Sequence, residues 1–398
     1  MQYHGLALAS QGAEVDLVGY TGAPLSPAVG AQSAITIHRI PSPKGDRWRP
    51  ARGTSRLTRA LWDRALVMLR LLPTLLWRVP SPDLLLVQNP PALPTLVVAV
   101  MVARLRGARL VIDWHNLSHT VLALRLGTSH WLVRLTRWCE RRMGGAADHH
   151  LAVSGAMRRQ LVDRYGLRGV TVQYDRPAEP FTPVSDQVRA EEKVRLLDLE
   201  AAATGGRVGL LVTATSWTLD EDVELLLDAL DLCEASLAPG DGSGLATLRV
   251  IISGDGPLRA AFDARLAARP SGRIRIETRW FEPAEYPTLL AAADLGVCLH
   301  RSSSGLDLPM KLADMLGCGL PVCTLDYGPV LRERLCDGQQ GRYFASAAAL
   351  AAQIRELFER FPDGDALTAL RTRTRGSDRT SWQQGWNREA GPILRSIG

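Results

Sequence analysis

Lysine is scarce in this chain. Only three of its 47 basic residues are lysines, and the others are all arginines. A lysine within a loop motif is therefore harder to explain as random surface charge than it would be in a lysine-rich protein. Lys311 is such a residue, because it follows a serine-rich segment that leads into a helix-like pattern.

Cysteine pairs are also missing. The six cysteines form no CxxC pair and lack histidines at zinc-site spacing, so neither a structural zinc nor a disulfide framework is indicated, and a reducing, cytosol-facing location fits best. No basic run interleaved with aromatic residues marks a groove for nucleic acid. The net charge of +6 and the pI near 9.2 then favour a membrane surface or a phosphorylated substrate as the anionic partner.

No segment has the run of about twenty apolar residues that crosses a bilayer. The best candidate, 61–79, is interrupted by Asp63, three arginines and a proline. It is better interpreted as a basic amphipathic helix. Together with 93–105, we expect it to rest on a membrane surface, with its cations toward lipid phosphates and its leucines toward acyl chains. A core-facing helix with solvated arginines is the alternative.

The length of the chain predicts two domains. At 398 residues, with 46% hydrophobic and 22% charged residues, the chain is globular and too long for one hydrophobic core. A charged, alanine-rich stretch indicates where the domains meet. We expect a first domain over 1–185, a linker over 186–207, a second domain over 208–375, and a C-terminal helix over 376–398 that packs back on the body.

Short hydrophobic strands alternate with helices, which is typical of a parallel doubly wound sheet. The strands expected in the first half are 14–20, 33–40, 83–89, 108–114 and 149–154. Those expected in the second half are 209–216, 248–254, 273–280, 293–300 and 318–326. Such a domain normally opens with a strand and a glycine-rich turn, but here a helix over 3–11 comes first. We therefore expect the chain to lack its own first strand and any anchor before it.

The strongest functional signal is the segment 300–322, HRSSSGLDLPMKLADMLGCGLPV. A loop of Ser302, Ser303, Ser304 and Gly305 can turn hydroxyls and backbone N–H groups toward an anion, and the helix N-terminus behind it adds its positive dipole end. The point charge of Lys311 suits a diphosphate. The segment therefore predicts a diphosphate cradle, with an ordinary capped helix as the alternative.

Two carboxylates and two flanking strands add to this motif. Asp314 follows Asp307 by seven residues, about two helical turns, so we expect both on one helix face where they could accept hydrogen bonds from sugar hydroxyls. The strands expected at 293–300 and 318–326 place the loop at the carboxyl end of a parallel strand, where ligands bind. This unit resembles the nucleotide-sugar half of GT-B glycosyltransferases.

Several segments, in order from Met1 to about Trp386, resemble the chitobiosyldiphosphodolichol beta-mannosyltransferase family. SSSGLDLPMK and VIDWHN are the most specific of them. The others are MQYHGLALASQGAEVDLVGY, LLVQNPPALP, YDRPAEPF, TSWTLDEDVELLLDAL and ISGDGPLR.

The resemblance implies an α/β protein of the GT-B fold, with two Rossmann-like doubly wound domains facing across a cleft. It implies a hexosyltransferase that moves mannose from GDP-mannose, with inversion, to a lipid-diphosphate-linked GlcNAc2 acceptor through a beta-1,4 bond. This is an early step of lipid-linked oligosaccharide assembly for protein N-glycosylation. The implied location is the cytosolic face of the endoplasmic reticulum membrane, or the cytoplasmic side of a membrane in a bacterium. Other glycosyltransferases of the pathway are further candidate partners.

The donor site implied by the motifs lies in the second half. Retaining GT-B enzymes often place an Arg and a Lys in the loop that corresponds to 216–222, but here that loop has Trp, Asp and Glu. Lys311 and Arg259, which follows a Gly-Asp-Gly-Pro turn, are therefore expected to neutralise the diphosphate. For Arg259 and its turn, a plain strand-to-helix connection is the alternative. No Asp-x-Asp motif is evident in a suitable loop, so no metal or other cofactor is expected. The expected donor contacts are Gly254, Arg259, Ser303, Ser304, Gly305, Asp307, Leu308, Lys311 and Asp314.

The acceptor site is expected in the first half, where the cluster D-W-H-N at 113–116 follows a hydrophobic strand. An inverting transfer needs a base for the acceptor hydroxyl. Asp113 and His115 are the two candidates, the sequence does not decide between them, and His4 is a weaker third. The expected acceptor contacts are His4, Gln88, Asn89, Trp114 and Asn116.

Two other classes of function stay open. One is a different GT-B enzyme with another nucleotide sugar or another polyprenyl-linked acceptor. The other is a non-catalytic scaffold that keeps the fold and binds a membrane or a partner enzyme.

Overall fold

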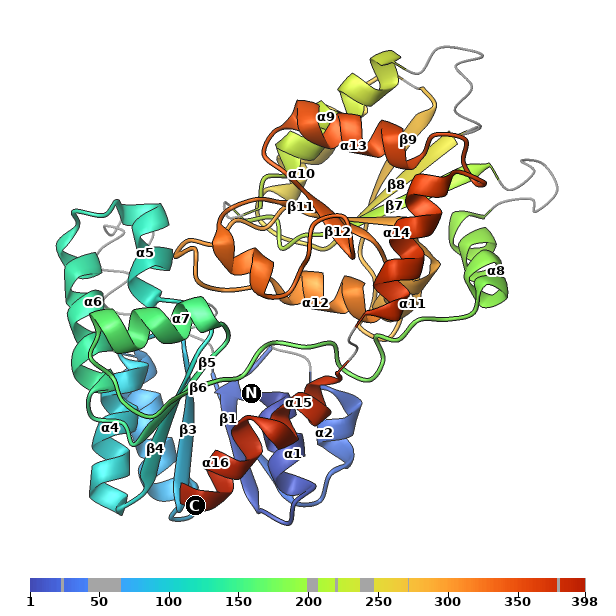
Figure 1. Cartoon of the computed structure of the whole chain (residues 1–398). Helices are drawn as coiled ribbons and strands as arrows, with labels where there is room; N and C mark the ends of the chain where they lie inside the picture. The colour runs from blue at the N-terminus through green and yellow to red at the C-terminus, as the bar shows by residue number, and fades with distance from the viewer. Residues whose placement is uncertain are drawn as a thin grey trace. The chain divides into compact units, whose positions relative to one another are not determined.

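The computed structural model describes residues 1–22, 25–41, 66–198, 207–218, 221–236, 247–270, 272–377 and 380–397. The chain folds into two compact units, which Figure 1 shows in colours that run along the sequence. Unit 1 is formed by Met1–Tyr174 and Gln383–Gly398, and unit 2 by Asp175–Trp382.

The division differs from the predicted one, since unit 2 begins at Asp175 rather than after a linker over 186–207. Residues Asp186–Leu197 of that predicted linker form helix α8 in unit 2. Arg189 and Lys193 of α8 bind the buried carboxylate of Asp294 at 2.7 and 2.5 Å. The charges that suggested a linker are thus part of a packed helix. Residues 199–206 lie outside the described residues.

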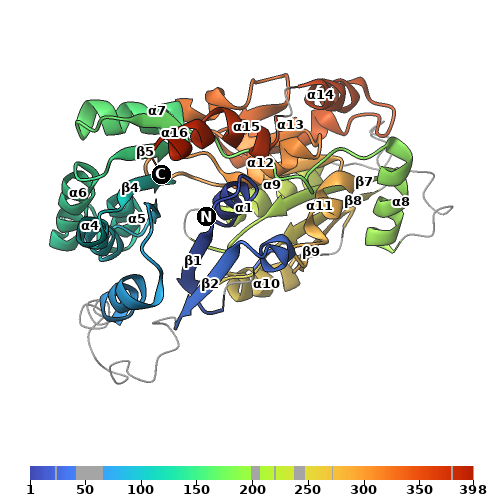
Figure 2. The same ribbon diagram turned by 90° about the horizontal axis from the view of Figure 1, so that it is seen from below.

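Unit 1 contains two parallel sheets (Figure 1 and Figure 2). The first pairs β1 (Val15–Tyr20) with β2 (Ile35–Ile40). The second has the order β3-β4-β5-β6, so the predicted strands are present but are divided between two sheets. Its strands are β3 (Leu84–Asn89), β4 (Arg109–Trp114), β5 (His149–Ala152) and β6 (Val170–Val172).

Helix α4 (Thr95–Arg106) belongs to the core of unit 1. Its Val98 and Val102 are buried and pack with Leu75 of the π-helical segment η2 (Thr74–Arg78). This corrects the membrane surface predicted at 93–105, because the apolar side of the helix faces protein. The predicted companion helix is described only from residue 66 onward. The other helices of unit 1 include α1 (Gln2–Ala9), α2 (Pro27–Ala31), α5 (Ser118–Leu126), α6 (Trp131–Gly144), α7 (Gly155–Arg159) and η3 (Gln160–Arg164).

The C-terminus packs back as expected, but as two helices, α15 (Trp382–Arg388) and α16 (Ala390–Ile397). Gln11, next to α1, donates to Asn387 at 3.2 Å and accepts from Arg395 at 2.6 Å. Trp386 is fully buried. The last residues of the chain are therefore part of unit 1.

Unit 2 has one parallel sheet in the order β12-β11-β10-β7-β8-β9. The chain runs outward in both directions from β7, so the strand order reverses between β7 and β10. In doubly wound sheets ligands bind at such a point. The strands are β7 (Val208–Ala214), β8 (Thr247–Ser253), β9 (Ile274–Arg279), β10 (Leu295–Cys298), β11 (Val322–Leu325) and β12 (Gly341–Phe344), of which only β12 was not predicted.

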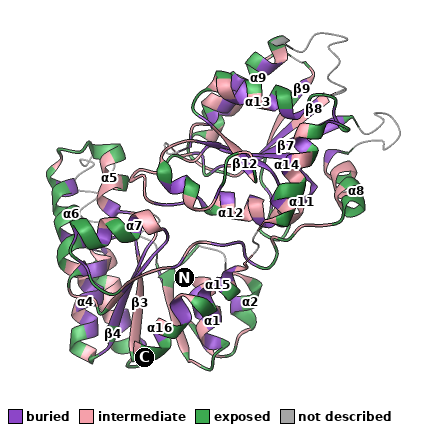
Figure 3. Ribbon diagram, in the orientation of Figure 1, coloured by how far each residue is buried: buried purple, intermediate pink, exposed green. Residues whose placement is uncertain are grey.

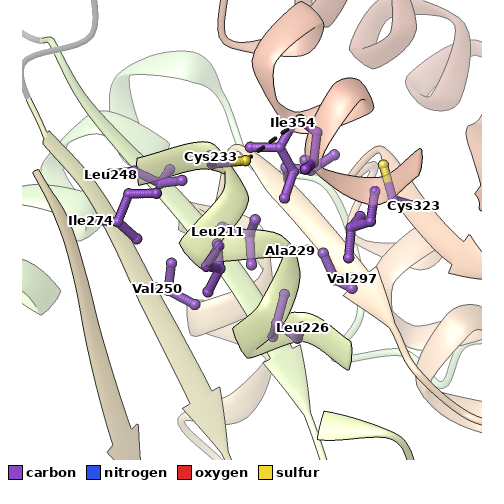
Figure 4. Packing of buried hydrophobic residues seen from close by; sticks show 14 of the residues in the cluster. Leu211, Leu226, Ala229, Cys233, Leu248, Val250, Ile274, Val297, Cys323 and Ile354 are labelled. Atoms are coloured by element: carbon purple, nitrogen blue, oxygen red, sulfur yellow. Dashed lines mark hydrogen bonds between the residues drawn. The ribbon is translucent and has the colours of Figure 1, made fainter. Parts of the chain in front are cut away.

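Helices α9 (Val223–Ser236) and α13 (Ala347–Leu357) cover one face of this sheet (Figure 4). Leu226 and Ile354 from these helices pack with Val250 and Val297 of the strands. The sequences of strands buried in this way are continuous apolar runs, and for this reason most of the strands could be predicted. The other helices of unit 2 include α10 (Arg259–Ala267), α11 (Tyr286–Ala292), α12 (Met310–Gly317), the 3-10 helix η4 (Pro329–Glu333) and α14 (Asp365–Gly376).

All six cysteines are free, in agreement with the sequence. Among the helices within the described ranges, none combines the length and the apolar character needed to span a bilayer.

Candidate active site

The loops that follow β7 and β10 meet at the reversal point of the unit 2 sheet. An isolated antiparallel bridge pairs Glu221 with His300, which joins the two loops. Lys311, in the first turn of α12, forms an ion pair with Glu221. The predicted cation therefore lies at the edge of the sheet where a ligand is expected.

Glu221 is the partner of Lys311 that the sequence did not predict. Its side chain is 4% exposed and also accepts hydrogen bonds from the Thr215 hydroxyl at 2.7 Å and from the Ser216 amide. The Lys311 side chain is 25% exposed. An ammonium group has three donors, so Lys311 can keep Glu221 and still contact a phosphate oxygen.

Polar groups of the serine loop after β10 form hydrogen bonds with one another. The Ser302 hydroxyl accepts from the amides of Ser304 and Gly305 at 3.3 and 2.8 Å, and the Ser304 hydroxyl accepts from Leu306 at 3.2 Å. Gly305 has φ of +70°, a conformation that glycine adopts without strain. These amide groups stabilise the loop itself, which differs from the predicted cradle of open N–H groups. Ser302, which was predicted to face an anion with the rest of the loop, instead organises the loop.

Asp307 and Asp314 do not share a helix face, because α12 begins only at Met310. The Asp307 carboxylate is buried and accepts from the hydroxyls of Ser302 and Ser304. It also lies 3.2 Å from His300. Asp307 therefore shapes the loop instead of facing a sugar.

Asp314 is a predicted donor contact whose pKa is raised in the fold. Burial raises the pKa of its carboxyl to about 7, and repulsion from Asp175 adds to the shift. The neutral acid is thus stabilised in the fold near neutral pH, and it can donate a hydrogen bond as well as accept one.

The glycine turn after β8 is held against the loop after β7. A Cβ atom at Gly254 would lie 1.8 Å from the carbonyl oxygen of Thr215, and one at Gly256 would lie 2.1 Å from that of Ser216. Arg259 donates to the carbonyl of Gly254 at 3.3 Å and to that of Thr278 at 3.2 Å. Both glycines are required by close packing, and Arg259 stabilises the turn.

A cavity of about 230 Å³ lies beside α12 within unit 2. It includes the predicted Leu308 but neither Lys311 nor the serines of the loop. Its lining comes from the start of the unit, α12 and the residues before it, the segment around η4, and the end of α14. The lining residues are Asp175, Pro177, Leu308, Pro309, Leu312, Ala313, Leu316, Gly317, Arg332, Glu333, Arg334, Cys336, Gln340 and Ser377.

In unit 1, Asp113 lies at the carboxyl end of β4 and contacts two histidines. Its Oδ2 atom is 2.8 Å from Nε2 of His115 and 3.3 Å from Nε2 of His4. The Asp113 side chain is 2% exposed, whereas that of His115 is 23% exposed. Burial alone would raise the pKa of Asp113, but the two histidines outweigh it and hold this pKa below its usual range. Asp113 is thus a buried carboxylate that orients histidines.

The C-terminal helix α15 fixes the tautomer of His4. The indole Nε1 of Trp386 donates to Nδ1 of His4 at 3.0 Å. An indole N–H can only donate, so Nδ1 accepts and the His4 proton lies on Nε2, facing Asp113. Both His4 nitrogens are therefore engaged within the fold, which removes His4 from the candidate bases. The sequence offered no local signal for this contact.

Asp113 orients His115 by the same rule. A carboxylate only accepts hydrogen bonds, so Nε2 of His115 donates to it and the lone pair of the neutral ring lies on Nδ1. This is the arrangement of a histidine base that is oriented by a buried acid. Of the two candidate bases, the geometry favours His115, because Asp113 is shielded from solvent.

A second buried acid, Glu140 of α6, holds the turn after β4. It accepts from the Ser118 amide at 2.5 Å, from Asn89 Nδ2 at 3.2 Å and from His119 Nδ1 at 2.6 Å. Asn89 Nδ2 also donates to the carbonyl of Asn116, and Asn89 Oδ1 accepts from the Ser118 hydroxyl. Asn89 is therefore a buried residue that stabilises the turn. Its predicted role as an acceptor contact was wrong. The sequence did not predict this role of Glu140, because the residue is distant in the chain from the turn that it stabilises.

Trp114 is likewise a core residue. It is fully buried, and its indole donates to Nδ1 of His150 at 3.1 Å, so it offers no stacking surface to an acceptor. Gln88 is partly exposed and lies opposite Asp113 in the β3–β4 register. Asn116 accepts from the Leu117 amide at 2.7 Å. Gln88 and Asn116 remain predicted acceptor contacts.

Among the residues that the structure describes, no group of three or more His, Cys, Asp or Glu side chains could hold a metal ion. The predicted absence of a metal requirement stays a prediction.

Two family descriptions match the chain, one in each unit. Residues 5–174 match the Glycosyl transferase 4-like domain, and residues 207–360 match Glycosyl transferases group 1. Among solved structures, the chain is similar to HepE of Anabaena in complex with UDP and glucose. The match covers 96% of this chain and 100% of the HepE chain, with a TM-score of 0.64 and 15% sequence identity. That likeness concerns the fold and agrees with the predicted GT-B class.

Two full-length relatives are closer in sequence. The UDP-glycosyltransferase TURAN of Arabidopsis thaliana is 35% identical, over 100% of this chain and 94% of that protein. The chitobiosyldiphosphodolichol beta-mannosyltransferase of Homo sapiens is 36% identical, over 99% of this chain and 89% of that protein. With matches of this kind along nearly its whole length, the chain belongs to the chitobiosyldiphosphodolichol beta-mannosyltransferase family of glycosyltransferases.

Proposed function

We propose that the protein transfers mannose from GDP-mannose to a lipid-diphosphate-linked chitobiose through a beta-1,4 bond, with inversion at the anomeric carbon. The observation that carries this proposal is the pair Asp113–His115, a buried carboxylate at 2.8 Å from a partly exposed imidazole. The names of the relatives supply the acceptor class. An inverting transfer needs one base on the acceptor side, and His115 fits that role.

The proposed reaction is a single displacement. The hydroxyl oxygen of the distal GlcNAc attacks the anomeric carbon of mannose from the face opposite the diphosphate. The bond from that carbon to the diphosphate oxygen breaks, and GDP leaves with both electrons of the bond. The hydroxyl proton passes to Nδ1 of His115, and Asp113 stabilises the imidazolium that forms.

Unit 2 is proposed to bind the donor. Lys311 offsets the charge that develops on the departing diphosphate, because an ammonium near an oxyanion stabilises it strongly in a site shielded from water. Ser303, Gly305 and Leu308 are proposed donor contacts on the loop that Asp307 shapes. Arg259 and Gly254 act indirectly, since they hold the neighbouring turn.

The product is proposed to be formed at a membrane, because a polyprenyl diphosphate acceptor resides there. The cytosolic face of the endoplasmic reticulum, or the cytoplasmic side of a bacterial membrane, is the corresponding location. Other glycosyltransferases that act on the same lipid are proposed partners.

The test is transfer of radiolabelled sugar from a panel of nucleotide sugars to a synthetic lipid-diphosphate chitobiose. We expect label only from GDP-mannose, and we expect beta-mannosidase, but not alpha-mannosidase, to release it. Label released by alpha-mannosidase would contradict inversion. No label from any donor, with a lipid-linked acceptor present, would favour the non-catalytic scaffold.

A UDP-sugar donor is the second candidate. It is favoured by the name of the Arabidopsis relative, a UDP-glycosyltransferase, and by the UDP bound to HepE. The same panel separates the two donors, and calorimetry with GDP and UDP gives an answer that does not depend on the acceptor.

A further inference from the structure

Helices α5 and α6 of unit 1 carry an exposed surface that is both apolar and cationic, and we call it the α5–α6 surface. Figure 3 shows exposed residues along both helices. Trp131, Leu135 and Trp138 lie on one side of α6 at helical spacing, and the two tryptophans are 44% and 59% exposed. The exposed apolar members are Val121, Leu124, Leu126, Trp131, Leu135 and Trp138.

The charge on this surface has one sign. Within 118–144, all of which the structure describes, there are five arginines and a single acid, Glu140. Glu140 is fully buried in the network that holds the turn after β4. Every formal charge that these helices present to solvent is therefore positive.

The opposite side of α6 is packed in the protein. Leu132, Val133 and Cys139 are buried there, so the exposed tryptophans are not needed by the core. Tryptophan and arginine together are typical of surfaces that lie in the headgroup region of a bilayer. The indole ring partitions at the boundary with the acyl chains, and arginine reaches the lipid phosphates.

The α5–α6 surface also adjoins the proposed base. Helix α5 begins at Ser118, and His115 lies in the turn directly before it. An acceptor whose diphosphate is anchored in a membrane reaches His115 most directly if the bilayer contacts the helix that starts at this turn.

We propose that the α5–α6 surface docks unit 1 on an anionic lipid bilayer and so presents the lipid-linked acceptor to His115. The inference rests on the proposed function for its acceptor. The bilayer contact itself depends only on the exposed side chains. It replaces 93–105, whose apolar side is buried in the core, as the membrane-facing region of the chain.

The test is co-sedimentation of the full chain with vesicles of phosphatidylcholine, with and without phosphatidylserine. We expect binding that increases with the anionic lipid and decreases with salt. Trp131→Ser with Trp138→Ser should weaken it about tenfold or more. Arg134→Gln with Arg137→Gln should weaken it about 25-fold, from roughly a fivefold loss per arginine. All four positions are exposed, and circular dichroism checks that the variants fold.

Two single tryptophan variants serve as matched controls. Trp280→Ser alters an exposed tryptophan of unit 2 and should leave vesicle binding unchanged. Trp77→Ser alters the exposed tryptophan of η2, within the first segment predicted to contact a membrane, and should have at most a small effect. If Trp77→Ser weakened binding more than the α5–α6 variants did, the proposed surface would be wrong.

Transfer to a water-soluble, short-chain acceptor distinguishes this proposal from the proposed function. We expect both α5–α6 double variants to keep near-wild-type transfer to that acceptor and to lose transfer to a vesicle-bound one. Wild-type protein that transfers mannose but does not bind anionic vesicles would overturn the docking proposal alone. If the double tryptophan variant instead changed the oligomer mass in light scattering, with vesicle binding intact, the surface would be a contact between copies.

Discussion

Trp386 and His4, 382 positions apart in the chain, share a hydrogen bond of 3.0 Å that sets the orientation of the Asp113 site. Trp386→Phe keeps the packing of a large ring but leaves Nδ1 of His4 without this donor. We expect a loss of about 1 to 2 kcal/mol in the free energy of unfolding and a lower turnover, because His4 can then turn away from Asp113. Chemical denaturation and steady-state kinetics measure the two effects. Trp382→Phe, on the same helix, should change turnover less.

Replacement of the proposed base should separate chemistry from binding. We expect His115→Gln to lower turnover by roughly 10²- to 10⁴-fold and to leave GDP affinity nearly unchanged. Asp113→Asn should act in the same direction, since the amide no longer fixes the proton on Nε2 of His115. The matched control is His149→Gln, a partly buried histidine on β5 that is hydrogen bonded to Thr171. Near-wild-type turnover in His115→Gln would require another base.

Lys311→Ala should weaken GDP binding roughly 10- to 150-fold, the effect of losing a charge-assisted contact of about 1.5 to 3 kcal/mol. Because this change also leaves the buried carboxylate of Glu221 without its ion-pair partner, the double variant Lys311→Ala with Glu221→Gln is needed. It should recover stability but not GDP affinity, as measured by calorimetry. Lys193→Ala, which removes a lysine paired with Asp294, is the control for charge alone. An unchanged dissociation constant in the double variant would remove Lys311 from the donor site.

Transfer should proceed without a divalent metal. The reason is that Lys311 can supply the positive charge that a metal ion would otherwise bring to the diphosphate. The measurement is turnover in EDTA, then after adding Mg²⁺ or Mn²⁺. Activity that disappears in EDTA and returns with either ion would contradict the prediction.

Stability should depend on pH through Asp314. Its pKa is raised to about 7 in the fold from the ordinary 3.8 of an aspartate, so between these values the folded state holds a proton that the unfolded state has lost. The free energy of unfolding should therefore fall as pH rises through this window and level off above about 7. In Asp314→Asn this component is absent, and the variant should gain Tm relative to wild type as pH increases from 4 to 7. Parallel melting curves across that range would contradict the assignment.

The strands and the main motif could be predicted because their signals are local. Buried parallel strands read as short apolar runs, and ten were expected where the structure has them. β12 (Gly341–Phe344) was missed because it is an edge strand, and Arg342 and Tyr343 at its centre are partly exposed. The start of α12 was set too early, which placed Asp307 on a helix when it lies in a loop that ends at Pro309.

The partners of the site residues could not be predicted in the same way. Glu140, Glu221 and Trp386 are brought to the turn after β4, to Lys311 and to His4 by tertiary packing, and no periodicity in the sequence encodes those distances. Conversely, Asn89 and Trp114 looked like acceptor contacts from their place at strand ends, but burial assigns them to the core. A strand-end position predicts the neighbourhood of a site and not the direction of each side chain.

Unit 1 is assembled from both ends of the chain, and this has a consequence for biosynthesis. A ribosome releases residues in order, so unit 2, which ends at Trp382, has all its residues outside before unit 1 does. Trp386 emerges after every residue of unit 2, and until then His4 lacks the donor that fixes its tautomer. The Asp113 site therefore stays incomplete while unit 2 is being synthesised, so unit 2 is the first of the two units for which folding during translation is possible.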